Sequence, residues 1–162
     1  MLITASCSKN FALYRERLGA FIGIAKTEKE QLAMHSHLAQ LARVIYSSPP
    51  AHGSGVVSTI LASKELNSLW RNELTAIRNN ITHLRQQLVE HLANYQLDKR
   101  FACITQQQGM FSFTGLQPEE VKKLTQDYAI YLVGNGRINI AGYNLNNIEY
   151  LAKSIASVVT NS

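Results

Sequence analysis

Residues 6–20 carry the sequence SCSKNFALYRERLGA, and this stretch decides how the rest of the chain is interpreted. The apolar run from Leu2 to Ala5 comes before it and predicts the end of a buried strand. Lys9 therefore lies in a hydroxyl-rich loop directly after a strand. A lysine in such a loop can form an imine with an aldehyde, and nearby hydroxyls together with Arg17 can hold a phosphate dianion. By residue spacing alone, a solvated surface lysine is the more common case.

The segments that follow this loop predict a second strand and two helices. Residues 18–25 are mostly apolar and predict the strand. Thr27 and Glu30 form a capping box for a helix, which the Pro-Pro pair at positions 49 and 50 stops. Residues 54–62 are rich in Val, Ile and small residues, so they predict a packed helix, with a strand as the alternative.

The clearest helix lies in the middle of the chain. Its apolar residues step alternately by four and three, as an amphipathic helix requires. They are Trp70, Leu74, Ile77, Ile81, Leu84 and Leu88. The pattern predicts a helix from roughly Ser63 to Tyr95, which at about 1.5 Å per residue would be nearly 50 Å long. Such a helix is long enough to bridge two subdomains.

From residue 76 onward the chain predicts an α+β arrangement, a small sheet with helices packed on it. Residues 101–105 and 110–114 are expected to be two strands joined by a polar turn. Residues 130–133 and 137–141 are expected to form a hairpin, because the Asn-Gly pair between them favours a tight turn.

Two further helices are expected in this part of the chain. Pro118 suits the first helical position, and two glutamates follow it, so a short helix is predicted to run to about Tyr128. The last helix is predicted from about Asn144 to Val159, with asparagine as its cap and an apolar face.

The composition is that of an ordinary soluble globular chain, with 46% hydrophobic and 17% charged residues among 162. No apolar run approaches the ~20 residues of a membrane helix, and the N-terminus has no signal-peptide pattern, so we expect a cytoplasmic protein. The formal net charge is +5, but the sixteen Lys and Arg are scattered, which weakens the case for a nucleic-acid partner. The spacing of the cysteines and histidines suggests no metal site.

The 6–20 stretch resembles the S-x-S-K-N-F-x-L-Y-x-E-R-x-G-A segment of the aspartate and aromatic amino acid aminotransferases. Residues 43–53, RVIYSSPPAHG, are similar to the R-x-x-Y-S-(N/S)-P-P-x-x-G stretch of the same family. Residues 109–116, GMFSFTGL, and residues 136–142, GRINIAG, resemble two more of its segments, in the same order. The resemblance covers essentially the whole chain, as the C-terminal portion of a longer enzyme.

The resemblance implies an α/β fold, the C-terminal part of the fold type I of transferases that depend on pyridoxal 5'-phosphate (PLP). Residues 1–75 would be the C-terminal remnant of the large PLP-binding domain. Residues 76–162 would be the small C-terminal α+β domain, and the long helix would bridge the two.

The resemblance also implies a cofactor site and a reaction. Lys9 matches the family lysine that binds PLP covalently and then acts as acid and base. Ser6, Ser8 and Arg17 match residues at the cofactor phosphate. The implied reaction is ping-pong transamination between an amino acid and a 2-oxo acid, with 2-oxoglutarate as the acceptor.

Three more residues are implied to bind the substrate. Arg137 matches the arginine that grips the α-carboxylate, a task that suits a forked guanidinium held on a strand. Arg43 matches the arginine that reaches in from the second subunit of a homodimer to bind the distal carboxylate. Phe111 would be an aromatic wall of the pocket. Without the resemblance, a structural salt bridge, a solvent-facing helical charge and a core phenylalanine would explain these three residues.

Two expectations concern activity and substrate. In the family, the residues that bind the pyridine ring precede the lysine segment, whereas only five residues precede Ser6. We therefore expect the chain to be inactive alone, as a truncated gene product or one half of a split enzyme. Aromatic substrates are favoured over aspartate, because Ser48 stands where aspartate-selective members usually have asparagine.

The alternative is a binding or regulatory module that retains the fold without the catalysis. Arg71, Arg78 and Arg85 are seven residues apart and would line one stripe of the long helix, where they could follow the phosphates of a nucleic acid. A solvated flank of an amphipathic helix explains this stripe equally simply.

Overall fold

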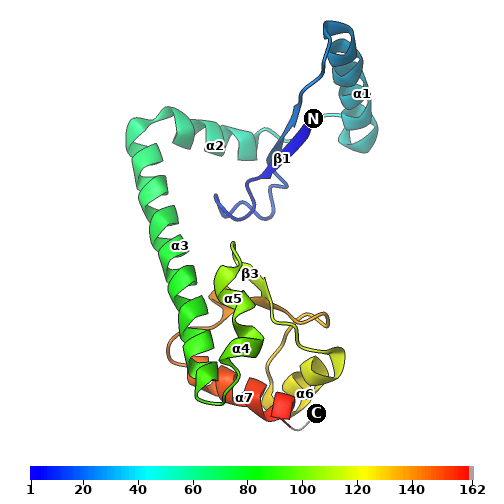
Figure 1. Cartoon of the computed structure of the whole chain (residues 1–162). Helices are drawn as coiled ribbons and strands as arrows, with labels where there is room; N and C mark the ends of the chain where they lie inside the picture. The colour runs from blue at the N-terminus through cyan, green and yellow to red at the C-terminus, as the bar shows by residue number, and fades with distance from the viewer. Residues whose placement is uncertain (161–162) are drawn as a thin grey trace. The chain divides into compact units, whose positions relative to one another are not determined.

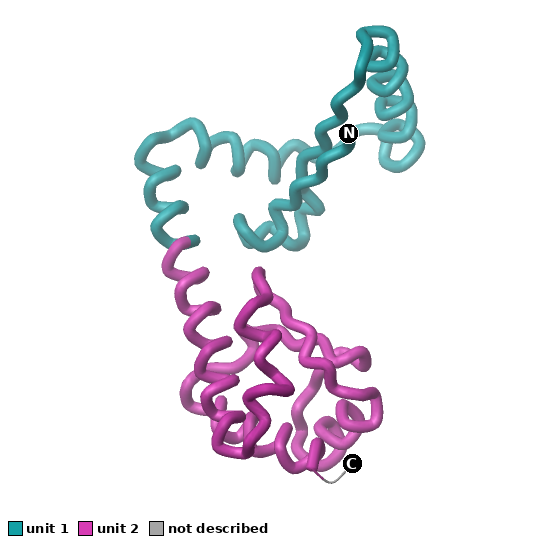
Figure 2. The backbone as a smooth tube through the Cα atoms, viewed as in Figure 1, with its two compact units in different colours: residues 1–74 teal, residues 75–162 magenta. Residues whose placement is uncertain are grey.

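The structure, a computed structural model, describes residues 1–160. The chain forms two compact units, Met1–Leu74 and Thr75–Ser162, which we call unit 1 and unit 2 (Figure 2). Their division lies next to the boundary that the sequence predicts at residues 75 and 76. The assignment of unit 1 to a cofactor-binding domain stays a prediction.

Unit 1 begins with a two-stranded antiparallel sheet (Figure 1). β1 (Leu2–Ser6) pairs with β2 (Gly19–Gly23), and Ile3 lies opposite Ile22. Both strands are predicted by the sequence, and the loop between them holds Lys9. The expectation that the first strand is buried is wrong, because every residue of β1 is exposed.

α1 (Glu28–Tyr46) and α2 (His52–Ala62) follow the sheet, and both helices are predicted by the sequence. Thr27 caps α1, since its side-chain oxygen accepts a hydrogen bond from the backbone N–H of Glu30 at 3.2 Å. The Glu30 carboxylate in turn accepts a hydrogen bond from the backbone N–H of Lys26 at 3.0 Å. The first bond satisfies a donor that the first turn of a helix leaves unpaired, and the second ties the residue before the cap to that turn.

The long helix α3 (Lys64–Ala93) runs from unit 1 into unit 2, as the apolar seam predicts. In unit 1 its Trp70 anchors the Lys9 loop. The indole ring stacks on Phe11 with ring centroids 4.5 Å apart, and the indole N–H donates a hydrogen bond to the backbone oxygen of Asn10 at 2.8 Å. The loop therefore has a tertiary anchor directly beside Lys9.

The hydrophobic core lies in unit 2. Here α3 packs with α4 (Asp98–Phe101), α5 (Cys103–Gln106), α6 (Pro118–Tyr128) and α7 (Ile148–Thr160). The largest fully buried apolar side chains are Phe101, Leu88, Leu92, Ile104, Leu124, Ile140, Ile148 and Ile155. They come from every helix of the unit, so the core joins segments that are far apart in the sequence.

A second two-stranded antiparallel sheet lies on this core. β3 (Phe111–Phe113) pairs with β4 (Arg137–Asn139), with Ser112 opposite Ile138. Ser112 and Ile138 are buried, whereas the residues on either side of them are exposed. One face of the sheet therefore covers the core and the other faces outward.

Two predicted strands are wrong. Residues 101–105 span the end of α4 and most of α5 instead of a strand. Phe101 and Ile104 are both buried and lie three residues apart, a helical spacing rather than an alternating one. Residues 130–133 are not a strand either, and only Val133 bridges to Arg137. β4 pairs with β3 instead. Of the predicted hairpin, the turn and the second strand, β4, are therefore present.

The two predicted helices of unit 2 are present. α6 begins at Pro118, and the side chain of Glu120 reaches back to accept a hydrogen bond from the backbone N–H of Gln117 at 2.7 Å. α7 begins at Ile148 rather than at Asn144, because Asn144 to Asn147 form a turn before the helix. Its predicted apolar face is buried except at Val159, which is partly buried.

Within residues 1–160, no helix combines the length and the apolar character needed to cross a membrane. In the same part of the chain, no group of three or more His, Cys, Asp or Glu residues is arranged to hold a metal ion. The predicted site residues lie in β1, the Lys9 loop and α1 of unit 1 and on the β3–β4 sheet of unit 2.

Candidate cofactor and substrate sites

The Lys9 loop leaves β1 through a tight set of hydrogen bonds between serines. The Ser6 hydroxyl donates to the Ser8 hydroxyl at 3.1 Å, and the backbone N–H of Ser8 donates to the Ser6 hydroxyl at 3.2 Å. The backbone N–H of Cys7 donates to the oxygen of Leu18 at 3.0 Å, which closes the base of the loop. Ser8 is buried, so its hydroxyl is held in place before any ligand arrives.

Lys9 and Arg17 both interact with Tyr14. The Lys9 ammonium nitrogen lies 4.6 Å from the centre of the Tyr14 ring, a cation–π distance. The Arg17 guanidinium donates to the backbone oxygen of Tyr14 at 3.0 Å. Arg17 has a φ of 50°, in the left-handed region that few non-glycine residues adopt, and such strain often accompanies a functional site.

Ser6, Ser8 and Arg17 line one open hollow of about 420 Å³ in unit 1. Hydroxyl groups and a guanidinium are the donors that bind a phosphate dianion through charge-assisted hydrogen bonds. The donor set therefore fits the phosphate of PLP. Lys9 follows Ser8 directly in the chain but does not line the hollow itself.

Arg137 and Phe111 lie together on the outward face of the β3–β4 sheet in unit 2. The carbon at the centre of the Arg137 guanidinium lies 4.8 Å from the centre of the Phe111 ring. Phe113 is the residue directly opposite Arg137 in the strand register. Arg137 is exposed, so its guanidinium is a cation with an aromatic support and is open to a ligand.

Arg43 lies in the last turn of α1 and is exposed. A cation near a helix C-terminus interacts favourably with the helix dipole, which explains its place without a ligand. Arg43 does not line the hollow that Ser6 and Ser8 share.

Two residues that the sequence analysis did not single out as site residues are buried beneath the sheet. The Arg85 guanidinium donates to the Ser112 hydroxyl and to the backbone oxygens of Gly109 and Phe111. The Tyr143 hydroxyl donates to the backbone oxygen of Leu84 at 3.3 Å. Burial lowers the pKa of Arg85 and raises that of Tyr143, because each loses solvation of its charged form.

The burial of Arg85 also corrects the proposed basic stripe. Arg71 and Arg78 are exposed on α3, but Arg85 has 4% exposure and cannot follow the phosphates of a nucleic acid. A signal for this was present in the sequence, since Arg85 lies four residues after Ile81 and therefore on the apolar side of the helix.

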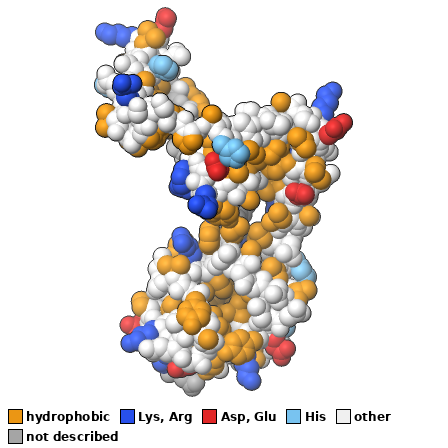
Figure 3. Space-filling model, turned by 180° about the vertical axis from the view of Figure 1, so that it is seen from behind, with side chains coloured by type: hydrophobic (Ala, Val, Ile, Leu, Met, Phe, Trp, Pro, Cys, Tyr) orange, Lys and Arg blue, Asp and Glu red, His pale blue; other side chains and the backbone are white. Residues whose placement is uncertain are grey.

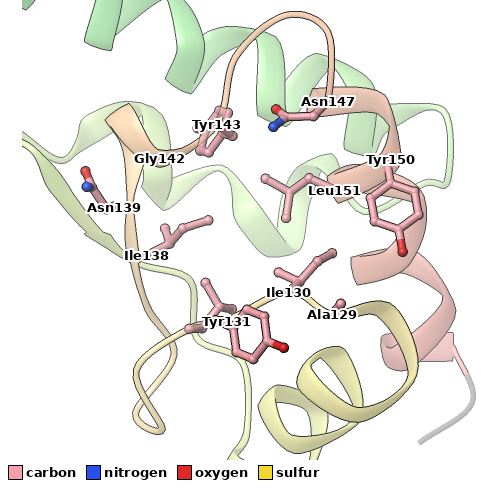
Figure 4. Close-up of a pocket in the computed structure, with 11 residues that line it drawn as sticks. Ala129, Ile130, Tyr131, Ile138, Asn139, Gly142, Tyr143, Asn147, Tyr150 and Leu151 are labelled. Atoms are coloured by element: carbon pink, nitrogen blue, oxygen red, sulfur yellow. The ribbon is translucent and has the colours of Figure 1, made fainter.

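A second hollow of about 420 Å³ lies in unit 2, between residues 129–132, β4 and the start of α7 (Figure 4). Its lining is mainly apolar and includes Ile130, Ile138 and Leu151. Figure 4 shows these side chains around the same space as the ring of Tyr131. None of the predicted site residues lines it.

Comparison with known proteins places this chain in a family. The family model for aminotransferase class I and II matches residues 1–155. The chain is 48% identical over 158 residues to the aromatic-amino-acid aminotransferase of Pseudomonas aeruginosa, covering 98% of this chain and 40% of the relative. It is 46% identical to the mitochondrial aspartate aminotransferase of Dictyostelium discoideum, covering 94% of this chain and 36% of the relative.

The likeness extends to solved structures. An aromatic-amino-acid aminotransferase from Burkholderia pseudomallei, covalently bound to pyridoxal phosphate, matches with a TM-score of 0.88 at 39% identity, over 97% of this chain and 39% of that chain. The chain thus spans about 40% of the length of the proteins it matches. The predicted fold, a C-terminal part of the PLP-dependent transferase fold type I, is confirmed, and the chain belongs to the class I and II aminotransferase family.

Proposed function

We propose that this chain provides the cofactor lysine and the α-carboxylate site of a PLP-dependent aminotransferase. The observation that carries the proposal is the hollow of unit 1, which Ser6, Ser8 and Arg17 line, with Lys9 directly after Ser8 in the chain. Relatives at 46–48% identity are named as aromatic-amino-acid and aspartate aminotransferases. The proposed substrates are therefore an aromatic amino acid or aspartate, with 2-oxoglutarate as the amino acceptor.

In this proposal the Lys9 loop holds the cofactor. Ser6, Ser8 and Arg17 would bind its phosphate, and Lys9 would be the residue that holds its aldehyde end. PLP supplies an electron sink that makes the Cα–H bond of the bound amino acid acidic. With the cofactor bound, the free Lys9 amine would accept the proton from Cα of the amino acid and hold it as an ammonium group until it is passed on to the product.

Arg137 orients the amino acid by binding its α-carboxylate. A guanidinium presents two parallel donors that match the two carboxylate oxygens, so one residue fixes both position and angle. Phe111 supports the guanidinium from below and forms part of the pocket wall. Fixing the carboxylate in this way keeps the Cα proton within reach of its acceptor.

The proposal extends to assembly, substrate choice and location. Arg43 would bind the distal carboxylate of a dicarboxylic substrate in the site of a second copy, which makes the active protein a homodimer in the cytoplasm. Ser48 favours aromatic substrates over aspartate. The chain spans about 40% of its relatives, so cofactor binding is a more direct test of these residues than turnover.

The experiment measures the absorbance of the purified chain mixed with PLP. We expect a band of lysine-bound cofactor that disappears in Lys9→Ala and weakens in Arg17→Ala. Lys29→Ala is the matched control, because Lys29 is an exposed lysine of the same unit on α1. Borohydride reduction followed by mass spectrometry of the peptides should place the cofactor on Lys9.

The band must depend on Lys9 and not on lysines in general. A band that survives in Lys9→Ala, or reduced cofactor spread evenly over Lys9 and Lys29, would contradict the proposal. Where transamination with 2-oxoglutarate is measurable, comparing tyrosine with aspartate as the amino donor tests the preference predicted from Ser48.

A further inference from the structure

The guanidinium of Arg85 is buried beneath β3 and binds three neighbouring groups of that strand and the turn before it. It donates to the Ser112 hydroxyl at 3.2 Å, to the backbone oxygen of Gly109 at 2.7 Å and to the backbone oxygen of Phe111 at 3.0 Å. Arg85 itself is 4% exposed and Ser112 is 1% exposed. These bonds fix the backbone on both sides of Met110.

Burying the guanidinium of Arg85 costs free energy of desolvation. Within residues 1–160, Arg85 forms no ion pair, so its oxygen acceptors and an electrostatic interaction with Tyr143 compensate its buried charge. Burial lowers the pKa of Arg85 for the same reason. An apolar residue would fill this position of the α3 seam without a desolvation cost. A specific geometric task for the guanidinium accounts for its presence.

The fixed backbone carries one half of the Arg137 site. Phe111 offers its backbone oxygen to Arg85 on the inner side and its ring to Arg137 on the outer side, with 4.8 Å between ring and guanidinium. β4, which carries Arg137, takes its register from β3. The backbone N–H of Ile140 also donates to the oxygen of Met110 at 2.9 Å. Arg85 is therefore linked to Arg137 through the single strand β3.

We propose that Arg85 is a positioning residue, which clamps the backbone of residues 109–112 and so aligns the Phe111 ring and the Arg137 guanidinium for carboxylate binding. The part that concerns carboxylate binding rests on the proposed role of Arg137. The clamp itself is a property of the folded chain and can be measured without cofactor or turnover.

The test uses the nuclear magnetic resonance signal of the Arg137 side-chain Nε–H group in the full chain. The Phe111 ring changes the chemical shift of this signal. Phe111→Leu removes the ring and so gives the reference position of the signal without it. Arg137→Lys identifies the signal by its loss. With the clamp weakened in Arg85→Met, we expect the signal to move at least half of the way to its position in Phe111→Leu.

Two milder variants keep the test decisive where Arg85→Met does not fold. Ser112→Ala removes one of the three acceptors and should cause a smaller shift in the same direction. Arg85→Lys keeps the charge but not the planar fork, so it should restore the signal only in part. If the Arg137 signal stays at its original position in these folded variants, the proposal is overturned.

A merely structural role is separated by matched controls. Ile155→Val and Ile155→Ala weaken the same core from α7. Of these two controls, the one with the melting temperature nearest to that of the Arg85 variant is compared with that variant. The clamp predicts that the control leaves the Arg137 signal in place. An equal shift in the control would show that Arg85 acts only through overall stability and would overturn the proposal.

A titration with 3-indolepropionate separates this inference from the proposed function, because a solved relative is described as an aromatic amino acid aminotransferase with that acid. Movement of the Arg137 signal on titration, weakened in the Arg85 variants, supports both. An Arg137 signal that depends on Arg85 but does not respond to the acid supports the clamp and contradicts the proposed role of Arg137.

Discussion

Unit 1 and unit 2 differ in how far their hydrophobic residues are buried. In unit 2 they are buried in one cluster that extends from Ile81 to Val158. In unit 1 they are exposed or only partly buried, and α1 has no buried residue at all. The most exposed large examples of unit 1 are Met1, Leu2, Leu32, Val44 and Ile45. Hydrophobic side chains are accordingly visible on the outside of the molecule in Figure 3.

This difference shows that an amphipathic pattern predicts a helix but does not predict which element covers its apolar face. α1 is formed and capped as its sequence predicts. Within residues 1–160, however, its apolar side chains are not buried by any other element. A two-stranded sheet with both faces exposed is marginal alone, and single helices gain most of their stability from packing. Unit 2 is therefore expected to carry most of the stability of this chain, whereas unit 1 depends on local bonds and the Trp70 anchor.

The largest expected effect comes from cutting into the core of unit 2. Phe101→Ala should lower the free energy of unfolding of unit 2 by about 3–5 kcal/mol, because it leaves a cavity where a fully buried ring was. The measurement is urea dependence of amide hydrogen exchange at Leu88 and Leu92. The matched change in unit 1, Leu41→Ala, should stay within about 0.5 kcal/mol. Equal losses for both would erase the contrast between the units.

The next effect concerns the anchor of unit 1. Trp70 is the single tryptophan of the chain, so its fluorescence reports on unit 1 alone. Phe11→Ala removes the stacked ring and should destabilise this unit by about 1–2 kcal/mol, which lowers the urea midpoint of the fluorescence change. Hydrogen exchange at Leu92 should not change. A fluorescence midpoint unaffected by Phe11→Ala would show that the stack does not hold the loop.

A smaller effect is expected at the start of α6. Glu120 accepts from Arg100 at 2.9 Å with both carboxylate oxygens and from the backbone N–H of Gln117. Glu120→Gln should cost about 1 kcal/mol in the urea unfolding of unit 2, because it weakens the cap and the ion pair of a partly exposed arginine. Glu119→Gln, at an exposed position of the same turn, is the control. Equal costs would show that only the helix dipole matters.

Most elements of this chain follow from local sequence signals. Thr27 with Glu30, Pro118 with Glu120, and the seam that includes Leu84 each carry their own start signal or periodicity, and each helix is present. Residues 101–105 and residues 130–133 are the exceptions. The five mixed apolar residues 101–105 fit a strand or two helical turns equally well. Packing onto the core of unit 2 decides between them.

The candidate sites could be predicted in part. The motif around Lys9 and the strand around Arg137 identify a family, and the family is confirmed. Which residues support these side chains could not be predicted, since the contacts of Arg85 with Gly109 and Ser112 join segments more than twenty residues apart. The sequence shows Arg85 as one more charge on a helix, and only tertiary packing shows that it is buried.

The smallest effect is a loss of stability in alkali that is specific to unit 2. Burial raises the pKa of the Tyr143 phenol above its ordinary value of 10.0, so the unfolded chain releases this proton before the folded chain does. The stabilising contribution is complete below pH 10 and falls as the pH rises beyond it, by about 0.8 kcal/mol at pH 10.5. Tyr143→Phe should remove that part of the pH dependence in urea unfolding, whereas Tyr131→Phe, at an exposed position of the same unit, should keep it. Identical alkaline slopes in the two variants would mean that Tyr143 ionises as readily in the folded unit as in the unfolded chain.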